Sequence, residues 1–232
     1  MNYAVPPAPI QALPIDGSDE QFPVNRIFCV GRNYAAHARE MGKDPDRDLP
    51  FFFMKPANAT VAVAGDDTAI PYPPKTANFH HEIELVVAIG KGGANIPVGQ
   101  ALDHVFGYAV GLDMTRRDVQ LEARDKGRPW EFGKSFAKSA PIGPVFRATE
   151  VGHVSEGAIA VTVNGEPRQH SDISKLIWSV AESIAYLSEF DTLEPGDIIM
   201  TGTPEGVNAV LPGDLMVGSI AGLGQIRVRV AT

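Results

Sequence analysis

The chain has 232 residues and a formal charge of −8 at pH 7, because 28 acidic residues outweigh 20 basic ones. This balance, with few clusters of lysine or arginine, argues against nucleic acid or an anionic membrane surface as the main partner. Hydrophobic residues make up 44% of the chain and charged residues 21%, which excludes a disordered protein and suits one sizeable domain. The single cysteine, Cys29, rules out an intrachain disulfide, and no apolar run is long enough to cross a membrane.

Residues 1–24 contain several prolines and no lysine or arginine. Proline favours extended backbone, so this stretch is expected to form an extended N-terminal arm outside a single domain of residues 25–232. The stretch also lacks the basic and apolar regions of a signal peptide. Together with the lone cysteine, this pattern is typical of a cytoplasmic protein, and that is the expected location.

A short predicted strand at 27–31 leads into residues 33–41, which have helical spacing. His37 and Glu40 stand three residues apart on one face of that helix, where the carboxylate could fix the imidazole tautomer and raise its basicity. The alternative is an exposed pair of the kind common on helix surfaces, which stabilises by only ~0.2–0.5 kcal/mol. Residues 43–50 are charged and contain two prolines, so they are predicted to form a mobile loop beside this helix that could act as a lid.

The run from His80 to Gly90 is apolar apart from its first residues, where Glu82 and Glu84 carry two carboxylates. Side chains alternate between the faces of a β-strand, so both glutamates project from the same side, roughly 7 Å apart at Cα. Neighbouring carboxylates repel each other unless a cation or a proton lies between them, and oxygen ligands select Mg²⁺, Mn²⁺ or Ca²⁺. The alternative is a solvated strand end, since exposed acidic residues are common.

The mostly apolar stretch at 105–113 is predicted to be a strand that ends in Asp113. An amphipathic helix is expected over 114–124, and capping of that helix is one explanation for the aspartate. The other explanation is a third carboxylate beside the glutamate pair. It would complete a three-ligand oxygen site with positions left for water and substrate.

The second half of the chain adds one candidate site residue and the remaining elements. Lys134 lies among aromatic residues, where a lysine can be desolvated and face an anionic group, although a surface lysine is the commoner case. Asn164-Gly165 predicts a tight hairpin, and residues 174–190 predict an amphipathic core helix. The turn at 201–206 has backbone N–H groups and hydroxyls that could hold a carboxylate or merely form a turn, and 213–230 predicts two strands that close a sheet or barrel.

Five short motifs carry these candidate residues, in the order Val30-Gly31-Arg32-Asn33-Tyr34 with His37, His81-Glu82-Ile83-Glu84, Gly111-Leu112-Asp113, Lys134-Ser135-Phe136 and Thr201-Gly202-Thr203-Pro204. Their residues and their order resemble those of the fumarylacetoacetate hydrolase family over about residues 25–230. The resemblance implies an α+β, β-rich fold, namely the mixed β-roll or barrel with flanking helices of the family's C-terminal domain. It also implies a homodimer, and within the family the match is closest to the small acylpyruvate-cleaving members.

The family resemblance implies an enzyme that uses a metal to cleave a carbon–carbon bond of an acylpyruvate, a 2,4-dioxo acid. Carried over residue by residue, it makes Glu82, Glu84 and Asp113 the ligands of Mg²⁺ or Mn²⁺, with Ca²⁺ as an alternative in a crystal. It makes His37 and Glu40 the pair that activates water for attack on the distal ketone, and Lys134 the group that stabilises the oxyanion. The residues implied to contact substrate are Arg117, Gln120, Thr203 and Arg32, with Arg32 or the turn at 201–206 as the receptor for a distal carboxylate.

The expected substrate is fumarylpyruvate, cleaved to fumarate and pyruvate in aromatic-compound (gentisate) degradation. Two alternatives are decarboxylation of oxaloacetate and isomerisation or decarboxylation of 2-hydroxyhepta-2,4-diene-1,7-dioate, because any chelated 2-oxo acid can reach the same metal enolate. A third alternative is a non-catalytic 2-oxo-acid-binding protein, against which His37, Glu40 and Lys134 argue. In every case the expected partner is a small molecule, and neither nucleic acid nor a membrane.

Overall fold

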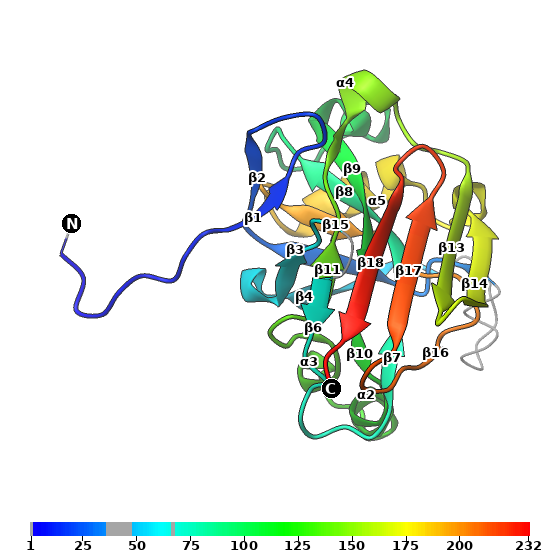
Figure 1. Ribbon diagram of the computed structural model, residues 1–232. Helices are drawn as coiled ribbons and strands as arrows, with labels where there is room; N and C mark the ends of the chain where they lie inside the picture. The colour runs from blue at the N-terminus through cyan, green and yellow to red at the C-terminus, as the bar shows by residue number, and fades with distance from the viewer. Residues whose placement is uncertain (1, 36–47, 66–67) are drawn as a thin grey trace.

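The computed structural model describes residues 2–35, 48–65 and 68–232, and its largest element is a curled sheet of eight strands (Figure 1). The strand order is β4-β3-β15-β8-β9-β11-β5, and β12 pairs with β9 beside this path. The β15–β3 and β11–β5 pairs are parallel and the other pairs are antiparallel, so the sheet is mixed. In chain order these strands are β3 (Ile27–Gly31), β4 (Phe51–Lys55), β5 (Thr60–Ala62), β8 (Ile83–Ile89), β9 (Val105–Leu112), β11 (Ala140–Ile142), β12 (Phe146–Arg147) and β15 (Ile198–Met200).

A second sheet, of five strands in the order β14-β13-β17-β18-β6, packs against β8 and β9. Its strands are β6 (Thr68–Ile70), β13 (Ala158–Val163), β14 (Glu166–Asp172), β17 (Leu215–Ile220) and β18 (Gln225–Val230). The two sheets approach closely at Gly218, where an added Cβ would come within 2.6 Å of the Ile83 side chain. A side chain at that position would therefore force β17 away from β8.

Strand β8 is buried on both of its faces, which explains why its sequence is almost continuously apolar. Ile83, Leu85 and Val87 belong to the buried cluster that lies between the two sheets. Val86 and Ala88 point the other way, into a second buried cluster. Any polar side chain at the start of this strand is thus held by a rigid, doubly packed element.

Two small sheets and several short helices surround the two larger sheets. The two-stranded sheet pairs β1 (Gln11–Pro14) with β2 (Gln21–Val24), and the three-stranded sheet has the order β10 (Thr115–Arg116), β7 (Phe79–His81) and β16 (Asn208–Ala209). The α-helices within the described ranges are α2 (Arg117–Asp125), α3 (Glu131–Lys134), α4 (Ala148–Val151) and α5 (Val180–Phe190). The 3₁₀ helices are η1 (Ala57–Ala59), η2 (Val98–His104) and η3 (Ile173–Lys175). The expected α+β, β-rich fold class is confirmed.

The expected extended arm at residues 1–24 differs from the structure over residues 11–24. Strands β1 and β2 form a hairpin there, and Leu13 and Phe22 are buried in the second cluster. Their burial offsets the conformational entropy lost on ordering the hairpin. The turn follows an Asp-Gly signal, with Gly17 at φ 66°. Only residues 2–10 extend away from the body (Figure 1).

Two predicted helices start later than their apolar spacing indicated, and both differences have a local cause. The helix expected at 174–190 begins at Val180, because Ser179 forms a capping box with Glu182. The helix expected at 114–124 begins at Arg117, because the two residues before it pair with β7. The hairpin predicted at Asn164-Gly165 is confirmed, with both residues at positive φ. Among the described residues, every helix is too short or too polar to cross a membrane.

Candidate active site

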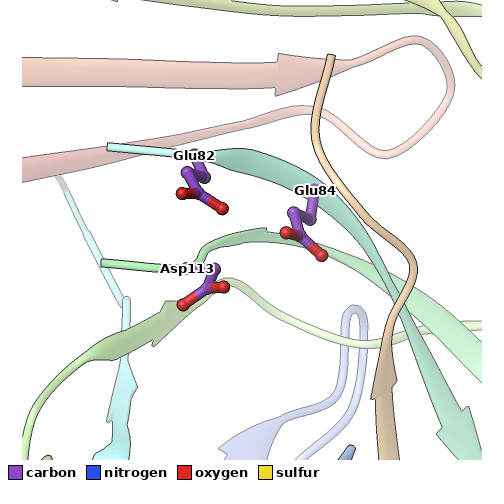
Figure 2. A group of neighbouring side chains, drawn as sticks. All are labelled: Glu82, Glu84 and Asp113. Atoms are coloured by element: carbon purple, nitrogen blue, oxygen red, sulfur yellow. The ribbon is translucent and has the colours of Figure 1, made fainter. Parts of the chain in front are cut away.

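Three carboxylates meet at one end of the β8–β9 pair. Strand β7 ends at His81 and β8 begins at Ile83, so Glu82 occupies the break between strands of two different sheets. The amide of Asp113, just after β9, donates to the Glu82 carbonyl at 2.9 Å. One oxygen from each of Glu82, Glu84 and Asp113 lies within 4.8 Å of the others, and Figure 2 shows the three carboxylates gathered around one space. The structure thus brings together the three residues that the sequence singled out.

Burial makes this cluster electrostatically demanding. Glu82, Glu84 and Asp113 are only 5%, 2% and 0% exposed. Burial raises the pKa of Glu84 well above its ordinary value, and the charges of Asp113 and Glu82 raise it further. The backbone N–H of Gly202 donates to Glu84 Oε2 at 2.7 Å and opposes the shift. Positive charge is therefore needed beside the cluster to keep all three groups ionised.

Lys134 supplies part of that positive charge from inside the protein. Its side chain is buried, and its Nζ donates to Glu82 Oε2 at 2.8 Å, to Asp113 Oδ2 at 2.6 Å and to Thr115 Oγ1 at 2.7 Å. Burial lowers the pKa of Lys134, but Asp113 and Glu82 more than offset this, so the net pKa is raised. Lys134 is thus a charged partner of the carboxylates, and the alternative of a surface lysine is wrong.

Three of the residues expected to contact substrate are already bonded to protein groups. Arg117 forms an ion pair with Glu82, and its Nη1 donates to Gln120 Oε1 at 2.5 Å. The hydroxyl of Thr203 donates to the Ile83 carbonyl at 2.8 Å, so its only hydrogen is used within the fold. Arg117 and Gln120 lie on the first turn of α2 and are buried, which fixes their positions beside Glu82.

A pocket that is open to solvent lies over the carboxylates. Besides the three carboxylates, its lining includes every described residue that was expected to contact substrate or support catalysis, namely Arg32, Arg117, Gln120, Lys134 and Thr203. Arg32 adopts φ 58°, which is uncommon outside glycine, and its guanidinium lies 5.2 Å from the centre of the Phe51 ring. His37, Glu40 and residues 43–47 of the expected lid lie outside the described residues, whereas residues 48–50 are described. Gly31 and Arg32, which line this pocket, precede residues 36–47 closely in sequence.

Comparison with known proteins identifies the fold. A family model described as fumarylacetoacetate (FAA) hydrolase C-terminal matches residues 26–231. The chain belongs to the fumarylacetoacetate hydrolase family. Among curated relatives, a fumarylpyruvate hydrolase of Ralstonia sp is 46% identical over 192 residues, covering 82% of this chain and 98% of that protein. The human mitochondrial oxaloacetate tautomerase FAHD1 is 43% identical over 197 residues, covering 85% of this chain and 87% of that protein.

A solved structure extends the comparison to nearly the full length of this chain. The crystal structure of fumarylpyruvate hydrolase from Pseudomonas aeruginosa, in complex with Mn²⁺ and pyruvate, is 60% identical. It superposes with a TM-score of 0.97 over 99% of both chains. The N-terminal hairpin, which precedes the region matched by the family model, lies within this superposed length.

The chemistry of the carboxylate cluster fits the divalent metal that the family resemblance implies. Three buried carboxylate oxygens within 4.8 Å of one another are hard ligands of the kind that Mg²⁺ and Mn²⁺ prefer. The raised pKa of Glu84 means that this group gains from any nearby cation. In this fumarylacetoacetate hydrolase family member, Glu82, Glu84 and Asp113 are therefore the residues that could hold a metal.

Sequence reasoning missed two cationic residues at this site. Lys55 is 1% exposed, and its Nζ lies 2.8 Å from Asp113 Oδ1 and donates to Ser139 Oγ at 2.9 Å. The available signal was a lysine closing an apolar strand, since a buried lysine needs a partner. Arg124 lines the pocket beside Arg32, one helical turn beyond Gln120. The sequence places Arg124 on a predicted helix, but it does not show that this residue would line the pocket.

Metal binding is expected to weaken as the pH falls. Because the pKa of metal-free Glu84 is raised, protons compete for this carboxylate at higher pH than for an exposed glutamate. The dissociation constant should rise by up to about tenfold per pH unit for each proton displaced. Calorimetric titration with Mg²⁺ or Mn²⁺ between pH 8 and pH 5 measures this, and a constant affinity across that range would contradict it.

Proposed function

We propose that this protein is a metal-dependent hydrolase that cleaves fumarylpyruvate, an acylpyruvate, into fumarate and pyruvate. The observation that carries the proposal is the buried Glu82, Glu84 and Asp113 cluster beneath a pocket edged by cationic side chains. The 60% identity to a fumarylpyruvate hydrolase with bound Mn²⁺ and pyruvate supports the choice of reaction. The family resemblance further implies a homodimer, and we propose that the protein acts in the cytoplasm, in gentisate degradation.

The charge balance of the site favours a doubly negative substrate. Three carboxylates of the cluster face three cationic groups, Lys55, Lys134 and Arg117, so these charges cancel. A divalent metal held by the carboxylates would leave a charge of about +2, and it would supply a Lewis acid that polarises the 2-oxo acid. Fumarylpyruvate carries two carboxylates, which would offset this charge and part of the positive charge of Arg32 and Arg124, which line the same pocket.

The chain's own residues would divide the work of hydrolysis. Lys134 is held against the cluster by three hydrogen bonds and would stabilise negative charge that develops on the substrate. Arg117 and Gln120 would orient the 2-oxo acid end from the first turn of α2. His37, oriented by Glu40, would take a proton from the water that attacks the distal ketone, as the family resemblance implies.

Arg32 and Arg124 would bind the distal carboxylate of fumarylpyruvate. Both line the pocket, and the pKa of Arg32 is lowered by burial and by the charge of Arg124. Two cations held this close gain from an anion between them. Arg124 also pairs with its neighbour Asp125 at 2.9 Å, but an exposed pair of this kind is worth little and can be exchanged.

Replacing Arg124 should therefore discriminate between substrates with and without a distal carboxylate. We expect Arg124→Gln to lower kcat/KM for fumarylpyruvate by about tenfold or more, the equivalent of one charged hydrogen bond. For acetylpyruvate, which lacks that carboxylate, kcat/KM should change by less than about twofold. Arg128→Gln is the matched control, since Arg128 is exposed and lies outside this pocket. Equal losses on both substrates would remove Arg124 from the receptor.

Product analysis tests the proposed reaction itself. Addition of water across the bond between the methylene carbon and the distal ketone places hydroxide on the ketone carbon and a proton on the methylene carbon. The reaction is run with Mn²⁺-loaded enzyme, quenched, and freed of metal before proton NMR. The spectrum should show fumarate and pyruvate in equal amounts. Release of CO₂ without fumarate would contradict the proposal.

A second candidate function is the keto–enol isomerisation of oxaloacetate. The observation that favours it is the 43% identity to human oxaloacetate tautomerase FAHD1 over 85% of this chain. Oxaloacetate is also a dicarboxylate with a 2-oxo acid end, so the same charge balance would accept it. This activity needs no attacking water, and a comparison of substrates separates it from hydrolysis.

A further inference from the structure

One buried amide outside the pocket bonds to the backbone on both sides of the carboxylate cluster. Gln169 lies on β14 in the five-stranded sheet and is 1% exposed. The β13–β14 pairing shifts register beside it, between Val161 and Thr162, and a bulge of this kind re-aims the nearby side chains. The side chain of Gln169 reaches from there to the break between β7 and β8.

The Gln169 amide makes four contacts, which use its full hydrogen-bonding capacity. Its Oε1 accepts from the Ile83 N–H at 3.1 Å and lies 3.0 Å from His81 Nδ1. Its Nε2 donates to the Pro204 carbonyl at 2.7 Å and to Thr203 Oγ1 at 2.8 Å. A buried amide with every partner present is rigid, because any rotation would leave polar groups unpaired.

The backbone partners fix which way round the amide lies. An N–H group can only donate and a carbonyl can only accept, so Oε1 faces Ile83 and Nε2 faces Pro204. His81 must then donate from Nδ1 to Oε1. The neutral imidazole is thereby held as the Nδ1–H tautomer, and its buried Nε2 has no hydrogen-bond partner among the described residues.

Both glutamates of the cluster depend on segments that this amide ties together. Glu82 stands between His81 and Ile83, and both of these residues bond to Gln169. Thr203 also bonds to the Ile83 carbonyl, and Gly202, next to it, holds Glu84 through its N–H. Gly206 lets this turn approach β14, because an added Cβ would come within 2.2 Å of the Arg168 carbonyl.

We infer that Gln169 is a positioning residue of the metal centre, which fixes Glu82 between two bonded neighbours and aligns the 202–204 turn that holds Glu84. The inference rests on the metal centre of the proposed function but is independent of the substrate. Outer partners of metal ligands typically contribute about 10–100-fold to metal affinity. Gln169 would act through the backbone that carries the ligands, from a different sheet.

The test compares Mn²⁺ binding by calorimetry in wild type, Gln169→Leu and the control Gln225→Leu, whose glutamine is exposed on β18. Leucine keeps most of the volume of glutamine and removes all four contacts. We expect the Gln169→Leu dissociation constant to rise by about 10–100-fold, and the control to match wild type. An affinity of Gln169→Leu within twofold of wild type would overturn the inference.

A spectroscopic readout keeps the inference testable if Gln169→Leu fails to fold. In ¹⁵N-histidine-labelled wild type, His81 should show the Nδ1–H tautomer, assigned by comparison with His81→Phe. Gln169→Glu should keep that tautomer, because a carboxylate still accepts from His81, yet bind Mn²⁺ more weakly, because it cannot donate to Pro204. An Nε2–H tautomer in wild type would overturn the inference, whereas a wild type that binds no Mn²⁺ would instead overturn the proposed function.

Discussion

Replacing Glu84 by glutamine is expected to weaken Mn²⁺ binding by at least about 100-fold, the upper end of what outer partners of metal ligands contribute. Glutamine has nearly the same shape, and its carbonyl oxygen can still accept the N–H of Gly202, so the surrounding fold is preserved. The variant lacks the negative charge that a divalent cation requires. Turnover should fall together with metal occupancy, and calorimetry with Mn²⁺ measures the binding directly.

The stability of the metal-free Glu84→Gln variant separates loss of the metal from loss of the fold. The pKa of Glu84 is raised in the folded protein, so ionising it costs stability as the pH rises above its unfolded value. At neutral pH the metal-free variant should therefore be at least as stable as metal-free wild type in thermal unfolding. Glu166→Gln, an exposed strand position, is the matched control and should bind Mn²⁺ normally. Wild-type affinity in Glu84→Gln would remove Glu84 from the ligand set.

Replacing Lys134 by methionine should give the opposite pattern, with the metal retained and turnover lost. Lys134 would act through its positive charge, because its three hydrogens are donated to Glu82, Asp113 and Thr115, and removing a preorganised group that stabilises developing negative charge typically lowers kcat by about 10²–10³-fold. Metal affinity should stay the same or increase, because the ammonium group repels a cation held by the same two carboxylates, Glu82 and Asp113. Steady-state kinetics and Mn²⁺ titration on one preparation give both quantities.

Two controls make the Lys134 result interpretable. Without metal the variant has one cation fewer beside the buried carboxylates and should be less stable, so kinetics and thermal unfolding are compared at saturating Mn²⁺. Lys126→Met removes an exposed lysine that pairs with Glu122 at 2.5 Å, outside the pocket, and should leave kcat unchanged. A kcat for Lys134→Met within about threefold of wild type would exclude a catalytic role for this lysine.

The carboxylate cluster was predictable because its geometry follows from strand periodicity. Glu82 and Glu84 stand two residues apart at the start of one apolar run, and Asp113 ends the next. Antiparallel pairing then places the end of the second run beside the start of the first, as the Ile83–Leu112 register shows. The break between β7 and β8 at Glu82 was not predictable. Strand β7 belongs to the small three-stranded sheet, where it pairs with β10 and β16, and both of these partners lie far from it in sequence.

The residues that sequence reasoning missed depend on contacts between distant parts of the chain. Lys55 meets Asp113 and Ser139, and Gln169 meets residues 81–83 and 203–204. The place of Lys55 at the end of an apolar strand hints at its burial, but no local pattern predicts the partners of either residue. Both are buried polar groups whose partners are supplied only by the folded sheets. The N-terminal hairpin is a different case, because Asp16-Gly17 between apolar residues was a readable turn signal outweighed by the prolines.

The central claim is metal-dependent hydrolysis of an acylpyruvate, and one comparison of substrates tests it most directly. Steady-state kcat/KM should be measured for fumarylpyruvate, acetylpyruvate and oxaloacetate with one Mn²⁺-loaded preparation, before and after complete removal of the metal. We expect fumarylpyruvate to have the highest kcat/KM, with activity lost on chelation and restored by Mn²⁺. A higher kcat/KM for oxaloacetate, or full activity without metal, would contradict the account.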